Sequence, residues 1–273
     1  MRDRKTILFA LTLGFFLSAE SIYSQSSPID LWHWKLELPT GYKASDWKLS
    51  NFQKDRFAKP FFYLDTADAA IVMEAYPAEG TSKAKYTRNT LREQMQAGSS
   101  DVNWTFKDGA ILEAEFQVTE MSTNSSGKLD RTILLQIDGR TTSEQTEDLG
   151  LKKPVSMPYL KIYWHKDRLY VKHRELKNET MIGDDLLLKS SWKEDDGVYS
   201  QEKIGFERVR LRIEVKKSKV KIYINDEKPI VYRGMSVSQW YFENYFTVGN
   251  YLQSKEEGAK SVVKFYKLSV SHD

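Results

Sequence analysis

The sequence predicts an all-β protein, a sandwich of two antiparallel sheets of the β-jelly-roll type. Apolar and polar residues alternate with period two through much of the chain, as expected for strands with one face in a core and the other in water. The chain is rich in residues that favour strands, with 13 Phe, 15 Tyr and 7 Trp among its 273 residues. No segment shows a sustained helical stripe. We therefore expect ten or so strands.

The composition limits the classes of protein that the chain can form. Hydrophobic residues make up 40% and charged residues 29%, which is enough apolar material for a core. The chain has no cysteine, which excludes a disulfide scaffold, a thiolate zinc site and a cysteine nucleophile. Its net charge of +3 suits an anionic partner but is too small for a typical nucleic-acid binder. We therefore expect no nucleic-acid partner.

The N-terminal segment has the features of a secretory signal peptide. Three basic residues precede an apolar run over residues 6–17, and small and polar residues follow through Ser24. The alternative is a buried N-terminal helix, which the basic start disfavours. We expect a signal peptide over residues 1–24, a mature chain of one domain over residues 25–273, and a secreted or periplasmic protein. No other segment is long and apolar enough for a membrane span, so we expect no membrane anchor. We also expect a monomer.

The strands are predicted from local patterns. Alternation is clearest over residues 112–118, 208–216 and 220–224. Further strands are predicted over residues 32–38, 70–76, 132–137, 160–164, 169–173, 246–251 and 262–270. Short helices are predicted over residues 51–57 and 236–241, and loops over residues 121–130, 141–153 and 189–201.

Three strands carry polar side chains that ordinary alternation does not explain. Residues 86–94 place Tyr86, Arg88, Thr90, Arg92 and Gln94 on one face. Residues 132–138 place three aliphatic side chains (positions 133, 135 and 137) on one face and two polar side chains (positions 136 and 138) on the other. Residues 245–253 place tyrosine, threonine and glutamine opposite an apolar set. Such polar faces on strands with apolar backs are candidates for a binding or catalytic surface.

These three segments resemble the signature motifs of the alginate lyases of polysaccharide lyase family 7. That family has strands reading Arg-(Ser/Thr)-Glu-(Leu/Val)-Arg-Glu, Gln-(Ile/Val)-His and Tyr-Phe-Lys-x-Gly-x-Tyr-x-Gln, in this order. The segment from Trp34 to Pro39 is also similar to its first strand, Trp-Lys-Leu-x-Leu-Pro. The resemblance covers nearly the whole mature chain. It implies a jelly roll whose concave groove binds an anionic polysaccharide.

Three positions depart from the family pattern. Thr90 replaces a glutamate, Asp138 replaces the catalytic histidine, and Thr247 replaces a lysine. The matching positions are Arg92, Gln136, Tyr245, Gly249, Tyr251 and Gln253. The resemblance therefore implies Tyr251, Arg92, Gln136 and Asp138 as the catalytic set. The flanking positions of the same motifs are the expected substrate-binding residues: Arg88, Thr90, Tyr245, Thr247 and Gln253.

The chemistry of a uronate lyase explains these residue types. The enzyme removes the C5 proton beside the carboxylate and expels the sugar linked at O4. Donors that bind the carboxylate stabilise the charge that develops, and Arg92 and Gln136 can supply them. Tyr251 can take the C5 proton as phenolate and return a proton to the leaving oxygen as phenol. We expect a neighbouring cation such as Arg92 to lower the pKa of Tyr251.

The replacement at Asp138 predicts a substrate preference. In mannuronate and glucuronate the C5 proton and the O4 leaving group lie on the same side of the ring, so one tyrosine can serve both steps. In guluronate they lie on opposite sides, and a second base is needed. We therefore expect a preference for mannuronate-type or glucuronate-type linkages. Asp138 is itself a base if its pKa is raised, or it pairs with Arg88 or contacts a sugar hydroxyl.

The histidines are poor replacements for the missing base. We expect structural or surface positions for all of them: His33 in the first strand, His165 and His173 around a hairpin, and His272 at a frayed C-terminus. His173 is the best substitute of the four. We find no cluster of His and carboxylates with metal-ligand spacing and expect no metal and no cofactor.

Other functions remain open at this point. The sequence is compatible with a lyase for alginate, a lyase for another acidic glycan such as glucuronan, or a non-catalytic glycan-binding domain. A glycoside hydrolase ranks last, because it requires two carboxylates around the scissile bond and no strand shows such a pair.

Overall fold

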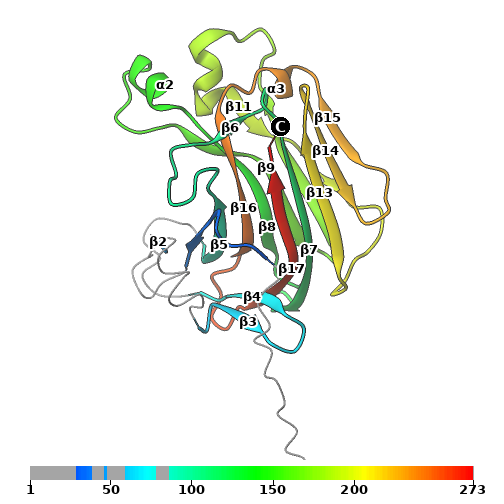
Figure 1. Ribbon diagram of the computed structural model, residues 1–273. Helices are drawn as coiled ribbons and strands as arrows, with labels where there is room; N and C mark the ends of the chain where they lie inside the picture. The colour runs from blue at the N-terminus through cyan, green and yellow to red at the C-terminus, as the bar shows by residue number, and fades with distance from the viewer. Residues whose placement is uncertain (1–28, 39–45, 48–58, 78–85, 273) are drawn as a thin grey trace, which may run out of the picture.

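The computed structural model describes residues 29–38, 46–47, 59–77 and 86–272, and in that part the chain forms seventeen strands in two sheets (Figure 1). The predicted signal peptide and the predicted helix over residues 51–57 lie outside the described residues. Every pair of neighbouring strands is antiparallel. The predicted sandwich of two antiparallel sheets is therefore confirmed.

One sheet has ten strands, and its main order is β11-β10-β9-β8-β16-β5-β1-β2, with β12 paired to β10 and β6 paired to β16. Its strands are β1 (Trp34–Glu37), β2 (Asp46–Trp47), β5 (Arg88–Glu93), β6 (Trp104–Thr105), β8 (Thr132–Arg140), β9 (Ser156–His165), β10 (Arg168–Leu176), β11 (Trp192–Glu194), β12 (Val198–Tyr199) and β16 (Glu243–Leu252).

The other sheet has seven strands in the order β15-β14-β13-β7-β17-β4-β3. Its strands are β3 (Phe62–Asp65), β4 (Ala70–Ala75), β7 (Ala110–Met121), β13 (Val209–Val215), β14 (Lys219–Ile224), β15 (Ile230–Arg233) and β17 (Ser261–Ser271). Figure 1 shows β17, in red, beside β7, so the C-terminal strand lies in the middle of this sheet.

The core lies between the two sheets and is continuous. Phe246 and Val248 of β16 are fully buried, as are Leu112 and Ile213 of the facing sheet. At one end Trp240 packs edge-on against Tyr159 and Trp192, with ring centroids 4.8 Å apart in each pair. Each large apolar side chain buried in this way stabilises the fold by roughly 1.5–3 kcal/mol. The apolar residues of each strand point into this core, so the polar residues that alternate with them point outward.

The predicted loops contain more structure than the sequence patterns indicated. Within residues 141–153 the chain forms helix α2 (Ser143–Asp148), which begins with a capping box between Thr142 and Gln145. Residues 189–201 include a 3₁₀ turn and the short strands β11 and β12. Strands of two or three residues are too short for alternation to reveal them. The helix predicted over residues 236–241 is shorter and earlier, as α3 (Met235–Ser238).

A β-bulge interrupts the pairing of β16 with β8. Val248 pairs with Leu135, but the next residues to pair are Tyr251 and Ile133, so the register shifts by one residue. Gly249 lies in this bulge with φ +147°, and a Cβ there would be 2.4 Å from the backbone oxygen of Asn89. The shift corrects the predicted face of Ile133, which pairs with Tyr251 and lies outside the core cluster, whereas Leu134 belongs to it.

Candidate active site

The register of three neighbouring strands, β8, β16 and β5, gathers the predicted residues on the outer face of the ten-stranded sheet. Thr247 of β16 is opposite Gln136 of β8 on one side and Arg92 of β5 on the other. Tyr245 is opposite Asp138, and Tyr251 is opposite Arg88. Residues opposite each other in antiparallel strands share a face. We call this surface, defined by Arg88, Arg92, Gln136, Asp138, Thr247 and Tyr251, the polar face.

Tyr251 and Arg88 form the most accessible part of the polar face. The Arg88 side chain is 43% exposed and its guanidinium contacts the Glu37 carboxylate at 2.5 Å. Burial raises the pKa of Tyr251, while the charge of Arg88 and a hydrogen bond from the Tyr86 backbone oppose that rise. The expectation of a lowered Tyr251 pKa is therefore wrong, and the nearest opposing cation is Arg88 rather than Arg92. The free protein keeps Tyr251 protonated at neutral pH.

Asp138 is held by two neighbours on the polar face. The Thr247 hydroxyl donates to its Oδ2 at 2.7 Å, and the Gln136 amide donates to its Oδ1 at 3.2 Å. Burial raises the pKa of Asp138, although the Thr247 hydrogen bond and the charge of Arg88 oppose the shift. The ion pair expected between Asp138 and Arg88 is not formed, because Arg88 pairs with Glu37. The two departures Asp138 and Thr247 thus contact each other.

Arg92 is buried, with 6% of its surface exposed. Its terminal nitrogens donate to the backbone oxygens of Glu93 and Ser100 and to Oδ1 of Asn103, each at 3.0 Å. Its guanidinium lies 3.8 Å from the centre of the Tyr245 ring. Most of its donors are therefore engaged within the protein, contrary to the expectation of an available fork. Burial also raises the pKa of Tyr245 to about 12.

Thr90 and Gln253, the two remaining predicted residues, border this group. Thr90 is buried, and its hydroxyl has no hydrogen-bond partner among the described residues. It is opposite Gly249 and so faces the outer side of the sheet. Gln253 donates to the backbone oxygen of Tyr251 at 2.9 Å and lines a cavity of about 540 Å³ with Arg131 and His165. The structure thus brings all nine predicted site residues onto one continuous surface.

The same surface continues onto β9 and β10, whose outward side chains were not among the predicted site residues. Lys161 of β9 is opposite Gln136, and Lys172 of β10 is opposite Lys161. Glu194 of β11 contacts both lysines. The signal that could have revealed them is the alternation of Lys161 and Tyr163 with apolar residues in the strand predicted over residues 160–164.

None of the four histidines lies within the group around Tyr251. His173 is buried, bonds Asp195 at 3.0 Å and stacks on Tyr232 of the other sheet with centroids 3.8 Å apart. It therefore faces the interior and does not replace the missing base. His165 bonds the Tyr199 hydroxyl at 2.7 Å through its Nδ1. Its position is on β9, two strands away from Tyr251.

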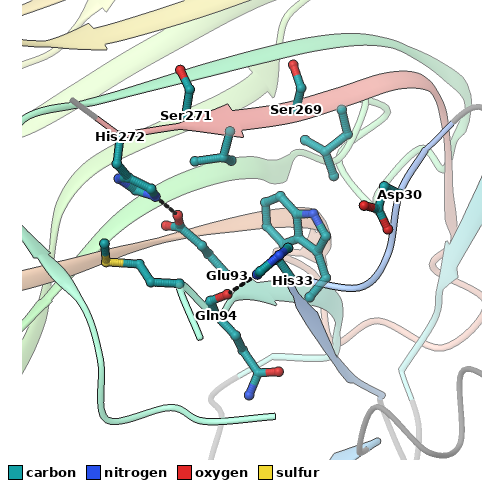
Figure 2. Close-up of a pocket in the computed structure, with 11 residues that line it drawn as sticks. Asp30, His33, Glu93, Gln94, Ser269, Ser271 and His272 are labelled. Carbon is teal, nitrogen blue, oxygen red and sulfur yellow. Dashed lines mark hydrogen bonds and ion pairs between the residues drawn. The ribbon is translucent and has the colours of Figure 1, made fainter. Parts of the chain in front are cut away.

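His272 is not frayed. Its Nε2 is 2.7 Å from the carboxylate of Glu93, beside a cavity of about 340 Å³ whose lining also includes His33 (Figure 2). Glu93 is buried and also accepts hydrogen bonds from the Trp104 indole and the Phe246 backbone. Figure 2 shows His272 and Glu93 pointing toward each other. This cavity is lined by residues of β5 and β17 rather than by Tyr251, and we assign it no part in the candidate site.

The part of the chain that the structure describes has neither a metal cluster nor a membrane-spanning helix. It contains no group of three His, Cys, Asp or Glu side chains placed to hold a metal ion. In the same part of the chain, no helix has the length and apolar character needed to cross a membrane.

Comparison with known proteins places the chain in a family. Residues 29–272 match the family model described as alginate lyase. Among curated proteins, no sequence matches. Solved structures share the fold: the family 7 alginate lyase A1-II′ in complex with a substrate (GGMG) is 23% identical, with a TM-score of 0.67 over 89% of this chain and 94% of that one.

Two further solved structures agree. A product complex (GGG) of the same lyase is 22% identical, with a TM-score of 0.71 over 91% of this chain and 100% of that one. The alginate lyase PA1167 from Pseudomonas aeruginosa is 21% identical, with a TM-score of 0.66 over 89% of this chain and 100% of that one. The family match spans the strands that build the polar face, so the chain belongs to the alginate lyase family and is a polysaccharide lyase.

Proposed function

We propose that the enzyme cleaves 1,4-linked uronate polymers of the mannuronate type, above all alginate, by β-elimination. The observation that carries the proposal is the pairing of Tyr251 with Arg88 across two adjacent strands of the polar face. A proton-transfer group and an accessible cation thus lie side by side, as removal of a proton next to a carboxylate requires.

The residues around Tyr251 take distinct roles in this proposal. Arg88 binds the substrate carboxylate, because its side chain is the more accessible of the two arginines. Arg92 stabilises the carboxylate through its remaining N–H groups and positions Tyr245. Tyr251 removes the C5 proton as phenolate and then protonates the O4 leaving group as phenol. Gln136 donates toward the carboxylate.

Asp138 fits a supporting role better than that of a base. Both of its oxygens accept hydrogen bonds, from Thr247 and from Gln136. Its raised pKa makes the neutral acid easier to reach, which lessens repulsion of the substrate carboxylate. With no second base next to Tyr251, elimination is restricted to linkages whose C5 proton and O4 group share a side of the ring. Mannuronate and glucuronate have this geometry.

The test is to incubate the purified enzyme with polymannuronate, polyguluronate and polyglucuronate and to follow the ultraviolet absorbance of the unsaturated product. We expect cleavage of polymannuronate at a rate that rises with pH, because Tyr251 must lose a proton and its pKa is raised. Tyr251→Phe should lower the rate by about a thousandfold or more. Faster cleavage of polyguluronate would refute the substrate assignment. Fastest cleavage of polyglucuronate would favour the glucuronan alternative, and binding without any cleavage would favour the non-catalytic one.

A second variant tests the reason for the preference. Asp138→His supplies a second base opposite Tyr245 on the polar face. If the absent base restricts the substrate, this variant should gain activity on polyguluronate relative to polymannuronate by about tenfold or more. Asp138→Asn is the matched control, since it changes the charge without adding a base. An equal gain in both variants would show that charge, and not the base, sets the preference.

The place of action is part of the proposal. We propose that residues 1–24 are removed during export and that the mature enzyme is a monomer outside the cytoplasm, where polymeric glycans are found. N-terminal sequencing of the exported protein should begin near residue 25, and size-exclusion chromatography should give the mass of one chain. A cell-associated protein that begins at Met1 would contradict this.

A further inference from the structure

A row of cationic and polar side chains crosses the outer face of the ten-stranded sheet. The register places one residue from each of six neighbouring strands in this row, from β10 to β1. In order they are Lys172, Lys161, Gln136, Thr247, Arg92 and Lys35. With strands about 4.8 Å apart, the row extends over about 24 Å. None of its members is a carboxylate, and four of the six are cations. Gln136 and Thr247 in the middle of the row donate to Asp138, and Arg92 donates to three oxygens of the protein, so the charge available to a ligand lies toward the lysines.

An aromatic row runs beside it on the same face. Tyr251 is opposite Ile133, which is opposite Tyr163, and Tyr163 is opposite Tyr170. Tyr170 in turn stacks on Tyr199 of β12 with ring centroids 4.4 Å apart. Aromatic rings present apolar surface on which sugar rings can lie. The two rows together complement a polyuronate. The cationic row suits its carboxylates, and the aromatic row suits the apolar faces of its sugar rings.

The far end of the cationic row carries an excess of positive charge. Glu194 is contacted by Lys161, by Lys172 at 3.5 Å and by Arg174 at 3.8 Å. All four side chains are partly buried, between 15% and 30% exposed. Although burial opposes it, the hydrogen bond from Lys161 lowers the pKa of Glu194, which therefore stays charged. Three cations around one anion repel one another, and a second anion would relieve this repulsion.

We infer that Lys161 and Lys172, with the half-buried Tyr170 beside them, form a distal subsite for the carboxylate and ring of a uronate unit remote from the cleaved linkage. The inference rests on the proposed function and adds to it a determinant of chain length. The two lysines lie two and three strands from Tyr251, about 10 and 14 Å across the sheet. A long chain can reach both positions at once, whereas a short oligomer bound over Tyr251 cannot.

The test measures the steady-state kinetics of Lys161→Met and Lys172→Met on a length series of mannuronate oligomers and on the polymer. We expect KM for the polymer to rise about tenfold in each variant, as for loss of one charge-assisted hydrogen bond, with kcat unchanged. The wild-type enzyme should gain in kcat/KM once an oligomer is long enough to reach the subsite, and the variants should lack this gain. Lys172→Arg should restore it.

Lys193→Met is the matched control. Lys193 lies next to Glu194 on the same strand, but its side chain is 57% exposed and pairs with Glu175 at 3.6 Å. Its loss removes one positive charge near the subsite without touching the cationic row, so KM should stay within about twofold. Equal KM values in Lys161→Met, Lys172→Met and Lys193→Met would overturn the inference. Thermal unfolding of each variant shows whether a kinetic loss reflects misfolding.

The subsite can be tested even if the enzyme cleaves none of the polymers. Affinity electrophoresis through gels that contain polymannuronate measures binding alone. Retardation of the wild-type protein that is lost in Lys161→Met and Lys172→Met, and absent in gels with carboxyl-reduced polymer, would support the subsite while the proposed reaction failed. Retardation that the variants retain, or no retardation of any protein, would overturn the subsite.

Discussion

The outer faces of the two sheets arise from the same alternation but differ in how their charges are matched. On the seven-stranded sheet, Arg210 contacts Asp226 at 2.9 Å with side chains 65% and 90% exposed. Lys267 contacts Glu113 at 2.8 Å, and Arg212 contacts the same carboxylate at 3.3 Å. Each of these cations has an acidic partner, and the pairs lie in water.

The polar face of the ten-stranded sheet is different. Arg92 is buried and its hydrogen bonds go to three neutral oxygens, while three cations share the carboxylate of Glu194. Exposed matched pairs contribute little to stability, so they are typical of a solvated surface. Buried or unmatched charges are costly and are retained where a ligand completes them. Alternation alone therefore identifies an outer face, and buried or shared charges such as Arg92 and Glu194 distinguish the outer face of the ten-stranded sheet from that of the seven-stranded sheet.

The largest effect on stability is expected from a substitution at Gly249, in the bulge beside the polar face. In Gly249→Ala the new Cβ would lie 2.4 Å from the Asn89 oxygen and 2.8 Å from the Thr90 Cα. We expect a loss of about 2–4 kcal/mol in urea unfolding and a displaced Tyr251. Gly258, with φ +77° and open space around it, is the control, and Gly258→Ala should cost about 1 kcal/mol. Equal losses of unfolding free energy in the two variants would mean that the close approach of the new Cβ at position 249 to the Asn89 oxygen costs nothing.

A pair of arginine substitutions tests the difference between the faces directly. Arg88→Gln removes the cation that opposes the rise in the Tyr251 pKa, so kcat/KM should fall by about a hundredfold and the rising limb of its pH profile should move to higher pH. Arg210→Gln removes an arginine that also has a carboxylate partner, on the other sheet. Its kinetics should match the wild type. A similar loss in both variants would remove the distinction that we draw.

The contact of His272 with Glu93 gives a pH dependence of stability with a definite sign. Burial alone would lower the pKa of His272, but the hydrogen bond to Glu93 and its charge outweigh this and raise the pKa. The stabilisation is therefore complete below the usual histidine pKa of about 6.5 and is lost as the pH rises through the higher folded-state value. Urea midpoints across this interval should fall more steeply for wild type than for His272→Gln. Parallel curves would contradict the assignment.

The smallest effect is expected on the seven-stranded sheet. Arg212→Ala breaks exposed contacts with Glu113 and Glu214, at 3.3 and 3.6 Å. Such pairs contribute about 0.2–1 kcal/mol, so the urea midpoint should barely move and cleavage should not change. A loss of activity would mean that this face also takes part in binding.

The fold class followed from period-two alternation in long strands, whereas the choice of site residues came from the resemblance of three strands to the motifs of the alginate lyases. Tyr251, Arg88 and Gln136 could be placed on one surface from their positions within their strands. The bonds that these residues make could not be predicted, since they depend on which strands pair and in what register. The burial of Arg92 under the loop that carries Ser100 and Asn103 is one example.

The bulge and the short elements were beyond the sequence patterns for a related reason. A one-residue shift of register between Ile133 and Leu135 of β8 places Ile133 on the other face, and alternation read from a single strand contains no information about it. Lys161 and Lys172 were overlooked because a lysine on an outward face is ordinary until its neighbours are known. Helix α2 is the exception, since Thr142 and Gln145 have the spacing of a capping box and could have indicated its start.

The contact between His272 and Glu93 also has a practical consequence for the use of the enzyme as a catalyst. Glu93 supports the backbone of Phe246, which adjoins Tyr245 and Thr247 on β16. A purification tag, a fusion partner or a solid support attached at the C-terminus, one residue after His272, would load this contact behind β16. Immobilised preparations should therefore be linked through the seven-stranded sheet, for example near Asp226, whose side chain is 90% exposed.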